Sequence, residues 1–188
     1  MKRSPWLFGG IALVVLLALW ALSGYNSLVT ERQNVETAWS QVETQYQRRF
    51  DLIPNLQATV QGAADFEQET FTAVTAARSQ WQNAGSRDEQ VAAAGEFDSA
   101  LSRLLVTVEA YPQLQATQAF RDFMTQLEGT ENRIATARRD YNEAVRTYSL
   151  AVKRFPGAIL AGIFGYDAEP GFEASEGSEN APSVNFGE

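Results

Sequence analysis

The apolar run of residues 5–22 constrains this chain most, because it contains no charged or strongly polar side chain. Folded as a helix, its 18 residues extend about 27 Å, which is close to the hydrocarbon thickness of a bilayer. Trp6 and Trp20 lie near the two ends, where interfacial aromatic residues are expected. The run therefore predicts a transmembrane helix over residues 5–23, through which the protein contacts the lipid bilayer.

A cleaved signal peptide is the alternative interpretation of the same run. Residues 21–23, Ala-Leu-Ser, are compatible with a small-x-small cleavage site. However, the run is longer than the usual apolar region of a signal peptide, and the polar chain after it continues with a helical pattern. No cysteine follows the run, which excludes a lipoprotein. An uncleaved anchor is the favoured interpretation.

The basic residues before the run indicate its orientation. Lys2 and Arg3 lie in the short N-terminus, residues 1–4, and the positive-inside rule keeps such residues in the cytoplasm. The chain is therefore expected to be a single-pass protein of the bacterial inner membrane. Its N-terminus would be cytoplasmic and its helical body extracytoplasmic, in the periplasm.

Apolar residues from Tyr25 to Phe155 recur at spacings of three and four, the pattern of amphipathic helices that pack on neighbours. Val35, Trp39, Val42, Tyr46 and Phe50 are a typical series. The pattern predicts an all-α fold: an elongated antiparallel four-helix bundle in residues 24–156. Its expected helices are about 25–52, 54–83, 88–110 and 113–155.

Prolines mark the expected turns of this bundle. The segment from Ile53-Pro54 to Thr59 resembles the segment from Tyr111-Pro112 to Thr117, which suggests two equivalent hairpin turns. Ser86 or Asp88 can cap the third helix. The last helix would be much longer than the first, so a kink or break at Gly129-Thr130 is expected to absorb the difference. The sequence leaves open whether the second hairpin turns at Pro112 or at Gly129.

The region after the bundle has two parts of different composition. Residues 157–166 are apolar and uncharged, and they would land at the bilayer surface as a membrane-proximal exit segment. Gly157, Ala161 and Gly165 have the small-xxx-small spacing of helices that approach closely in lipid, although a glycine-rich exit loop is an equal alternative. Residues 167–188 are acidic and rich in Gly, Ser and Pro, which predicts a disordered tail.

Composition argues against most enzyme chemistry. The 188 residues include no cysteine and no histidine, which excludes disulfides, His-ligated zinc and a Ser-His-Asp triad. The net charge of −8 repels phosphate, so no nucleic-acid partner is expected. The sequence indicates no catalytic, cofactor-binding or metal-binding residue, no cofactor and no small-molecule substrate.

Four charged residues nevertheless fall within the apolar stripes: Arg49, Glu67, Arg78 and Arg138. One interpretation is a polar cluster inside the bundle, such as a carboxylate site for a metal. The favoured interpretation is ion pairs between helices that fix their register, or arginines whose heads remain in water.

Short motifs over residues 25–156 resemble one known family. They are Tyr25-Asn26-Ser27-Leu28-Val29, Arg48-Arg49-Phe50-Asp51-Leu52-Ile53-Pro54-Asn55-Leu56, Glu109-Ala110-Tyr111-Pro112, Thr130-Glu131-Asn132-Arg133-Ile134-Ala135, Tyr141-Asn142 and Phe155-Pro156. Together they resemble the LemA family. The resemblance implies one N-terminal span followed by a helical bundle, no established active site, and an assembly-type role at a membrane. The exit segment departs from the family, with Gly157-Ala158 where an Asn is common.

These features predict a non-enzymatic, membrane-anchored helical bundle. We expect it to act as a scaffold of the cell envelope or as a self-assembling, membrane-organising protein, and therefore as a homo-oligomer. The alternative is an accessory binding module for another membrane protein, such as a protease or a sensor. A carboxylate-dependent enzyme is a remote third possibility.

Overall fold

The computed structural model describes residues 5–60 and 68–173 of the chain. Over these two ranges the regular structure is entirely helical, which confirms the all-α prediction. The helices are α1 (Pro5–Phe50), α2 (Ile53–Val60), α3 (Gln68–Asn83), α4 (Arg87–Glu109), α5 (Pro112–Gln115), α6 (Gln118–Lys153) and α7 (Gly157–Phe164).

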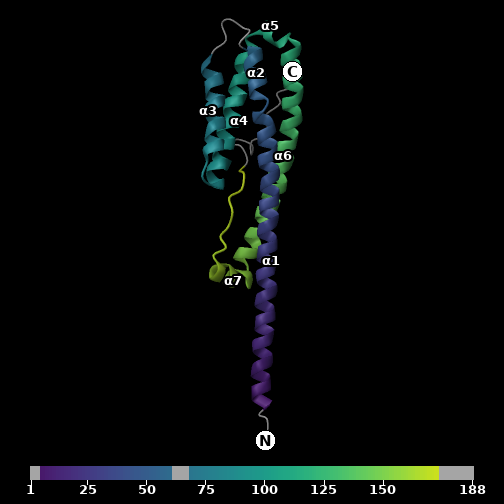
Figure 1. Ribbon diagram of the computed structural model, residues 1–188, viewed down its shortest axis with the longest axis vertical. Coiled ribbons are helices and arrows are strands. Elements are labelled where there is room, and N and C mark those ends of the chain that lie inside the picture. Colours follow the sequence, from purple (N-terminus) through teal and green to yellow (C-terminus); the bar gives the residue numbers. More distant parts are fainter. Residues whose placement is uncertain (1–4, 61–67, 174–188) are drawn as a thin grey trace, which may run out of the picture.

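Helix α1 continues from the apolar run into the body of the protein as one helix of 46 residues. Figure 1 shows its N-terminal part projecting alone below the other helices, and its C-terminal part lying among them. The apolar part is long enough to cross a membrane, and none of its 18-residue apolar window is buried in the structure. An exposed surface of this kind is suited to lipid rather than to water.

Two antiparallel helix pairs make up the body, which is called the bundle below. Helix α6 runs along α1, and α3 and α4 form a shorter hairpin beside the upper parts of these two helices (Figure 1). Helices α2 and α5 lie at the end of the bundle that is farthest from the N-terminus. At the opposite end, α6 and α1 extend below the α3–α4 hairpin and are joined there by α7.

The buried core follows the apolar stripes of the sequence, and its centre is aromatic. Trp39 stacks on Trp81 with 5.9 Å between ring centroids, and Trp81 stacks on Tyr46 at 4.5 Å. Phe50 meets Phe97 edge to face at 4.9 Å. Large rings in such arrangements bury much apolar area and add specific ring contacts. The helical periodicity therefore identified most of the core correctly, whereas Phe155 at the end of the same pattern is 83% exposed.

The second hairpin turns at Pro112, not at Gly129. Tyr111 precedes the short helix α5, and Thr117 then caps α6 by accepting a hydrogen bond from the N–H of Phe120. Helix α6 passes through Gly129 without interruption, so the expected break there is wrong. The extra length of α6 is instead accommodated beside α1, below the end of the α3–α4 hairpin.

The expected cap of the third helix is also visible in detail. Ser86 accepts a hydrogen bond from the N–H of Glu89, and the Glu89 carboxylate accepts one from the N–H of Gly85 at 2.7 Å. This reciprocal arrangement satisfies N–H groups that a helix start otherwise leaves free. Asp88 lies in the first turn, where the helix dipole favours an acidic residue.

The chain after α6 is more ordered than the sequence predicted. Residues 157–164 form α7, and residues 166–173, here called the strap, run back along the bundle in irregular form (Figure 1). The predicted disorder is therefore wrong for residues 167–173, because specific side chains of the bundle hold them. The rest of the predicted tail, residues 174–188, and the central part of the expected helix 54–83, residues 61–67, lie outside the described residues.

Candidate functional site

A polar cluster lies inside the bundle, where α1, α4 and α6 approach each other. Arg49 is 2% exposed, and its guanidinium lies 2.5 Å from the Asp98 carboxylate. Arg138 lies 2.5 Å from the other oxygen of Asp98 and also donates to the Tyr46 hydroxyl. Glu131 pairs with Arg49 from α6. A guanidinium as buried as that of Arg49 persists only when it is paired in this way.

Burial dominates the electrostatics of this cluster. It raises the pKa of Asp98 to about 6, although the neighbouring Arg49 acts in the opposite direction. Burial likewise lowers the pKa of Arg49 and of Arg138. Both arginines remain protonated at neutral pH, because a guanidinium in a protein is effectively always protonated. The cluster is thus an ion-pair network that joins three helices.

The structure separates the four charged residues that the sequence singled out. Arg49 and Arg138 meet at Asp98, whereas Arg78 lies over the Phe50 ring at 6.0 Å. Glu67 lies outside the described residues. Among the residues that are described, no three acidic side chains form a group that could hold a metal ion. The observed contacts correspond to the ion-pair interpretation.

Sequence reasoning missed Asp98 and Glu131 as members of this network. Asp98 directly follows the core residue Phe97, so its position at the edge of an apolar stripe was an available signal. Glu131 is exposed and gives no such signal.

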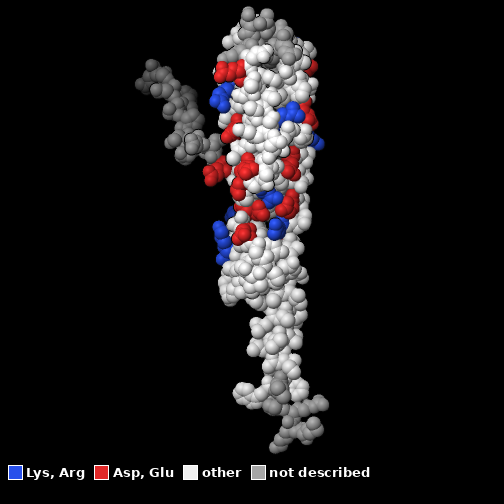
Figure 2. Space-filling view, turned by 60° about the vertical axis from the view of Figure 1, so that its left-hand side comes forward, with Lys and Arg blue, Asp and Glu red and all other residues white. Residues whose placement is uncertain are grey.

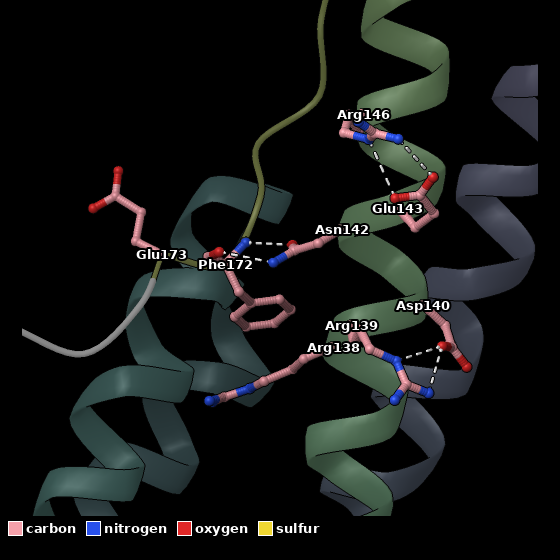
Figure 3. Close-up of a pocket in the computed structure, with 8 residues that line it drawn as sticks. All are labelled: Arg138, Arg139, Asp140, Asn142, Glu143, Arg146, Phe172 and Glu173. Carbon is pink, nitrogen blue, oxygen red and sulfur yellow. Dashed lines mark hydrogen bonds and ion pairs between the residues drawn. The ribbon is translucent and has the colours of Figure 1, made fainter. Parts of the chain in front are cut away.

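A second polar site holds the strap. The Asn142 side chain donates to the carbonyl oxygen of Phe172 and accepts from the N–H of Phe172, both at 2.9 Å (Figure 3). The Tyr141 hydroxyl donates to the carbonyl oxygen of Pro170 at 2.6 Å. Burial raises the pKa of Tyr141 to about 12, so this hydroxyl keeps its proton at neutral pH. Three hydrogen bonds therefore fix the strap's main chain.

Side chains of the strap also have specific partners. Arg87 forms an ion pair with Glu169 at 2.7 Å and another with Glu36 at 2.8 Å. The Phe172 ring stacks on Trp39 with 6.0 Å between centroids. The guanidinium of Arg138 lies 4.7 Å from the centroid of the same Phe172 ring, a cation–π distance.

These five residues, Trp39, Arg87, Arg138, Tyr141 and Asn142, are called the strap site below. Arg138 belongs both to the strap site and to the polar cluster, so the strap lies directly against the network at the centre of the bundle. Open hollows flank the strap: one of about 630 Å³ on the side of Arg139, Glu143 and Arg146, and one of about 710 Å³ on the side of α4. In Figure 3 the Arg146–Glu143 and Arg139–Asp140 pairs already satisfy each other.

A third feature is an apolar surface at the lower end of the bundle. Leu160 and Ala161 of α7 are buried against α1 near Leu28. The opposite side of α7 is uncovered, with Ile163 68% exposed, and Phe155 just before α7 is 83% exposed. Ile159 extends the same surface, and Phe164 borders it, half exposed, with its ring 4.8 Å from that of Tyr25 on α1. These four exposed residues, Phe155, Ile159, Ile163 and Phe164, are called the α7 face below.

Charged side chains are scarce on one face of this end of the molecule, although Lys153 and Arg154 directly precede Phe155. Figure 2 shows acidic and basic side chains gathered on the upper body, and a lower part free of them on the visible face. Gly24 of α1 permits the contact, because a Cβ there would collide with Leu160. Helix α7 thus lies beside residues 21–28 of α1, level with the end of the apolar run and the turns that follow it.

The small residues of α7 do not share one helix–helix surface. Ala161 packs in the contact with α1, Gly157 lies against the backbone of Ala151, and Gly165 ends the helix with φ of 69°. Glycine suits that last position because left-handed backbone conformations are strained for other residues. The segment is a helix docked on the bundle, and not the alternative loop.

Comparison with known proteins gives one family match and several relatives. Residues 38–186 match the model of the LemA family. The chain is 31% identical over 179 residues to magnetosome protein MamQ 2 of Paramagnetospirillum magneticum, a match that covers 81% of this chain and 66% of the relative. It is 28% identical over 202 residues to magnetosome protein MamQ of Magnetospirillum gryphiswaldense, with 88% and 74% covered.

A more distant relative is protein LemA of Metamycoplasma hominis, 24% identical over 131 residues, which covers 69% of this chain and 60% of the relative. The chain thus spans about two thirds or less of the length of most of these relatives. The family match includes α6, α7 and the strap, so the strap lies within the part of the chain that the family model matches.

Proposed function

Because the chain belongs to the LemA family, we propose that it is a membrane-anchored helical bundle that works by contact and not by catalysis. In this proposal it is a self-assembling scaffold of the bacterial cell envelope. Residues 5–23 cross the inner membrane once, with the N-terminus in the cytoplasm and the bundle in the periplasm. Two relatives carry the name of a magnetosome protein, which fits a role in membrane organisation.

The observation that carries the proposal is the α7 face beside the exposed apolar part of α1. A soluble bundle would expose Phe155 and Ile163 to water at a cost of roughly 25 cal/mol for each Å² of apolar area. A bilayer that surrounds α1 up to about Leu22 would cover this face at the level of the headgroups. The unbroken course of α1 past Ser23 supports an anchor over a cleaved leader.

Contact with the bilayer at two places would fix the orientation of the bundle relative to the membrane. The span alone leaves a bundle free to rotate and tilt, whereas α7 adds a second point of attachment on one side of α1. Copies attached in this way present the same face at the same height above the membrane. Because all copies would have the same orientation, the same contact could repeat between neighbouring copies, which a scaffold requires.

A second candidate function is an accessory module for another membrane protein. The open, charged hollows beside the strap favour it, because a partner's polar side chains could enter them. The two candidates differ in what the purified protein does alone. A scaffold assembles with itself, whereas an accessory module stays small until its partner is present.

The test uses the full-length protein reconstituted in liposomes, with particle size measured after detergent extraction and the membranes imaged. The scaffold proposal predicts large homomeric particles that contain only this chain. Ile163→Glu should reduce assembly, because a carboxylate opposes burial in lipid. Val106→Glu is the matched control, since Val106 is 64% exposed on α4. Small particles in every condition would favour the accessory module.

A further inference from the structure

We propose that the strap site is a peptide-recognition site, and that neighbouring copies exchange their straps through it. The ligand is an extended segment with an acidic residue, Pro, Gly and an aromatic residue, as in Glu169–Phe172. The occupant to which the proposal commits is the strap of a second copy of this chain. This inference rests on the scaffold proposal and supplies the contact by which copies would be joined.

Main-chain recognition is the first argument. The Asn142 side-chain amide forms hydrogen bonds with both the N–H and the carbonyl of Phe172. These two bonds recognise the main chain of Phe172 and not its side chain. The Tyr141 hydroxyl adds a third bond, to the carbonyl of Pro170. Each bond requires an extended strand at this place, and none depends on which molecule supplies it. Such bonds give affinity, and pockets for side chains give selectivity.

Side-chain selectivity is the second argument. Arg87 receives a carboxylate, and the Trp39 and Tyr141 rings together with Arg138 receive an aromatic ring. Between them only a small residue fits, since a Cβ on Gly171 would lie 3.3 Å from Oδ1 of Asn142. The site therefore selects acid, small and aromatic residues in a fixed order. Every copy of the chain carries that order.

The connection between α7 and the strap is the third argument. Helix α7 ends at Gly165, and the connecting residues Asp167 and Ala168 are exposed. Residues 166–168 together span at most about 10 Å, so exchange would join copies whose strap-bearing faces touch. The contacts of residues 169–173 would be kept in the exchanged form, so exchange is opposed by the entropy of association and by rearrangement of the contacts of Tyr166 with Tyr25 and Arg32.

Membrane anchoring would lower the entropic cost of association between copies. Copies that are anchored by the same span and by the α7 face hold their strap sites at one height. Confinement to a plane raises the effective concentration of one copy's strap near another copy's site. Reciprocal exchange would give closed dimers, and one-directional exchange would give open chains of copies.

The natural absence of cysteine allows a direct test. Ala92 of α4 and Glu173 of the strap border the same hollow. One full-length chain carries Ala92→Cys and another carries Glu173→Cys, and the two are reconstituted together in liposomes and oxidised. Exchange predicts a heterotypic disulfide between the two chains. The matched control replaces Ala92→Cys by Thr44→Cys, which lies on α1 beside a hollow without strap residues.

The heterotypic product should exceed the Thr44→Cys control severalfold. Adding Phe172→Ala to the Glu173→Cys chain should return the yield to the control level. An excess of a peptide with the sequence of residues 166–173 should also compete, whereas a scrambled peptide should not. Equal competition by the scrambled peptide would show that the site accepts any peptide, which contradicts selection of a second copy.

A chain with both Ala92→Cys and Glu173→Cys distinguishes the remaining outcomes. If it forms its internal disulfide while the mixed chains give only the control yield, the strap stays within one copy and exchange is wrong. If neither disulfide forms, the strap does not occupy its site and the recognition site itself is wrong. Large particles without heterotypic disulfides would overturn this inference and leave the scaffold proposal standing.

Discussion

The Arg49 guanidinium and the Asp98 carboxylate lie 2.5 Å apart and connect α1 to α4 in the middle of the bundle. The second oxygen of Asp98 holds Arg138 on α6 at the same distance. One carboxylate thus joins three helices. Because it pairs with both arginines, its removal breaks two ion pairs at once.

Asp98→Ala should destabilise the fold by about 1.5–3 kcal/mol at neutral pH, since it removes the hydrogen-bonded acid that Arg49 and Arg138 share, while Glu131 still pairs with Arg49. The control is Glu143→Ala, which breaks the exposed pair with Arg146 and should cost less than about 1 kcal/mol. Urea unfolding followed by circular dichroism measures both. Equal losses would mean that the network contributes no more than a surface pair.

The same residue should make stability depend on pH. Burial raises the pKa of Asp98 to about 6 in the fold, whereas an unfolded Asp has about 3.9. Its contribution to stability is therefore fully present below about pH 4 and is lost as the pH rises through about 6. The free energy of unfolding of the wild type minus that of Asp98→Asn should rise by about 1–3 kcal/mol from pH 7 to pH 4. A difference that stays constant with pH contradicts this assignment.

The residues that the sequence identified correctly are those whose position repeats. Trp39, Tyr46 and Trp81 fall on helical stripes, and all are buried. Pro54 and Pro112 lie where helices begin, and the matching residues Leu56 and Leu114 after them are both buried. Periodicity and backbone chemistry act locally, so one sequence is sufficient to read them.

The residues that escaped prediction depend on single partners far away in the chain. Glu169 is held by Arg87 and Phe172 by Asn142, across 82 and 30 positions of sequence. Nothing repeats in the strap, and its composition is that of a disordered tail. Its Pro-Gly-Phe segment was the available signal, because a large aromatic residue is unusual in such a composition. The uninterrupted course of α6 through Gly129 was missed for a related reason, since the partner of its extra length below the hairpin is α1.

Trp39→Ala should cost about 3–5 kcal/mol of stability, because the ring is buried among Trp81, Tyr141 and Phe172. Trp20→Ala provides the control of identical chemistry, since Trp20 is 40% exposed on the projecting part of α1. It should change the stability of the bundle by no more than about 0.5 kcal/mol. Thermal unfolding in detergent compares the two, and similar losses would place the core elsewhere.

Leu16→Arg should impair membrane insertion, since an arginine at the middle of a span costs about 2.5–3.5 kcal/mol. Leu16→Val keeps the residue apolar and should insert normally. Carbonate extraction of membranes from expressing cells measures the fraction inserted. A reporter fused after Glu188 should be active only in the form that functions outside the cytoplasm, and activity of a cytoplasmic reporter would reverse the proposed orientation.

The continuity of α1 between its apolar part and the bundle has a mechanical consequence. From Leu22 to Phe50 the helix is about 42 Å long, so a span tilt of about 20° would move its far end sideways by about 14 Å. The rigid rod thus acts as a lever. A membrane-spanning helix adapts to a change in bilayer thickness by tilting. Such a tilt would displace the far end of the bundle laterally, by an amount that grows with the length of the rod.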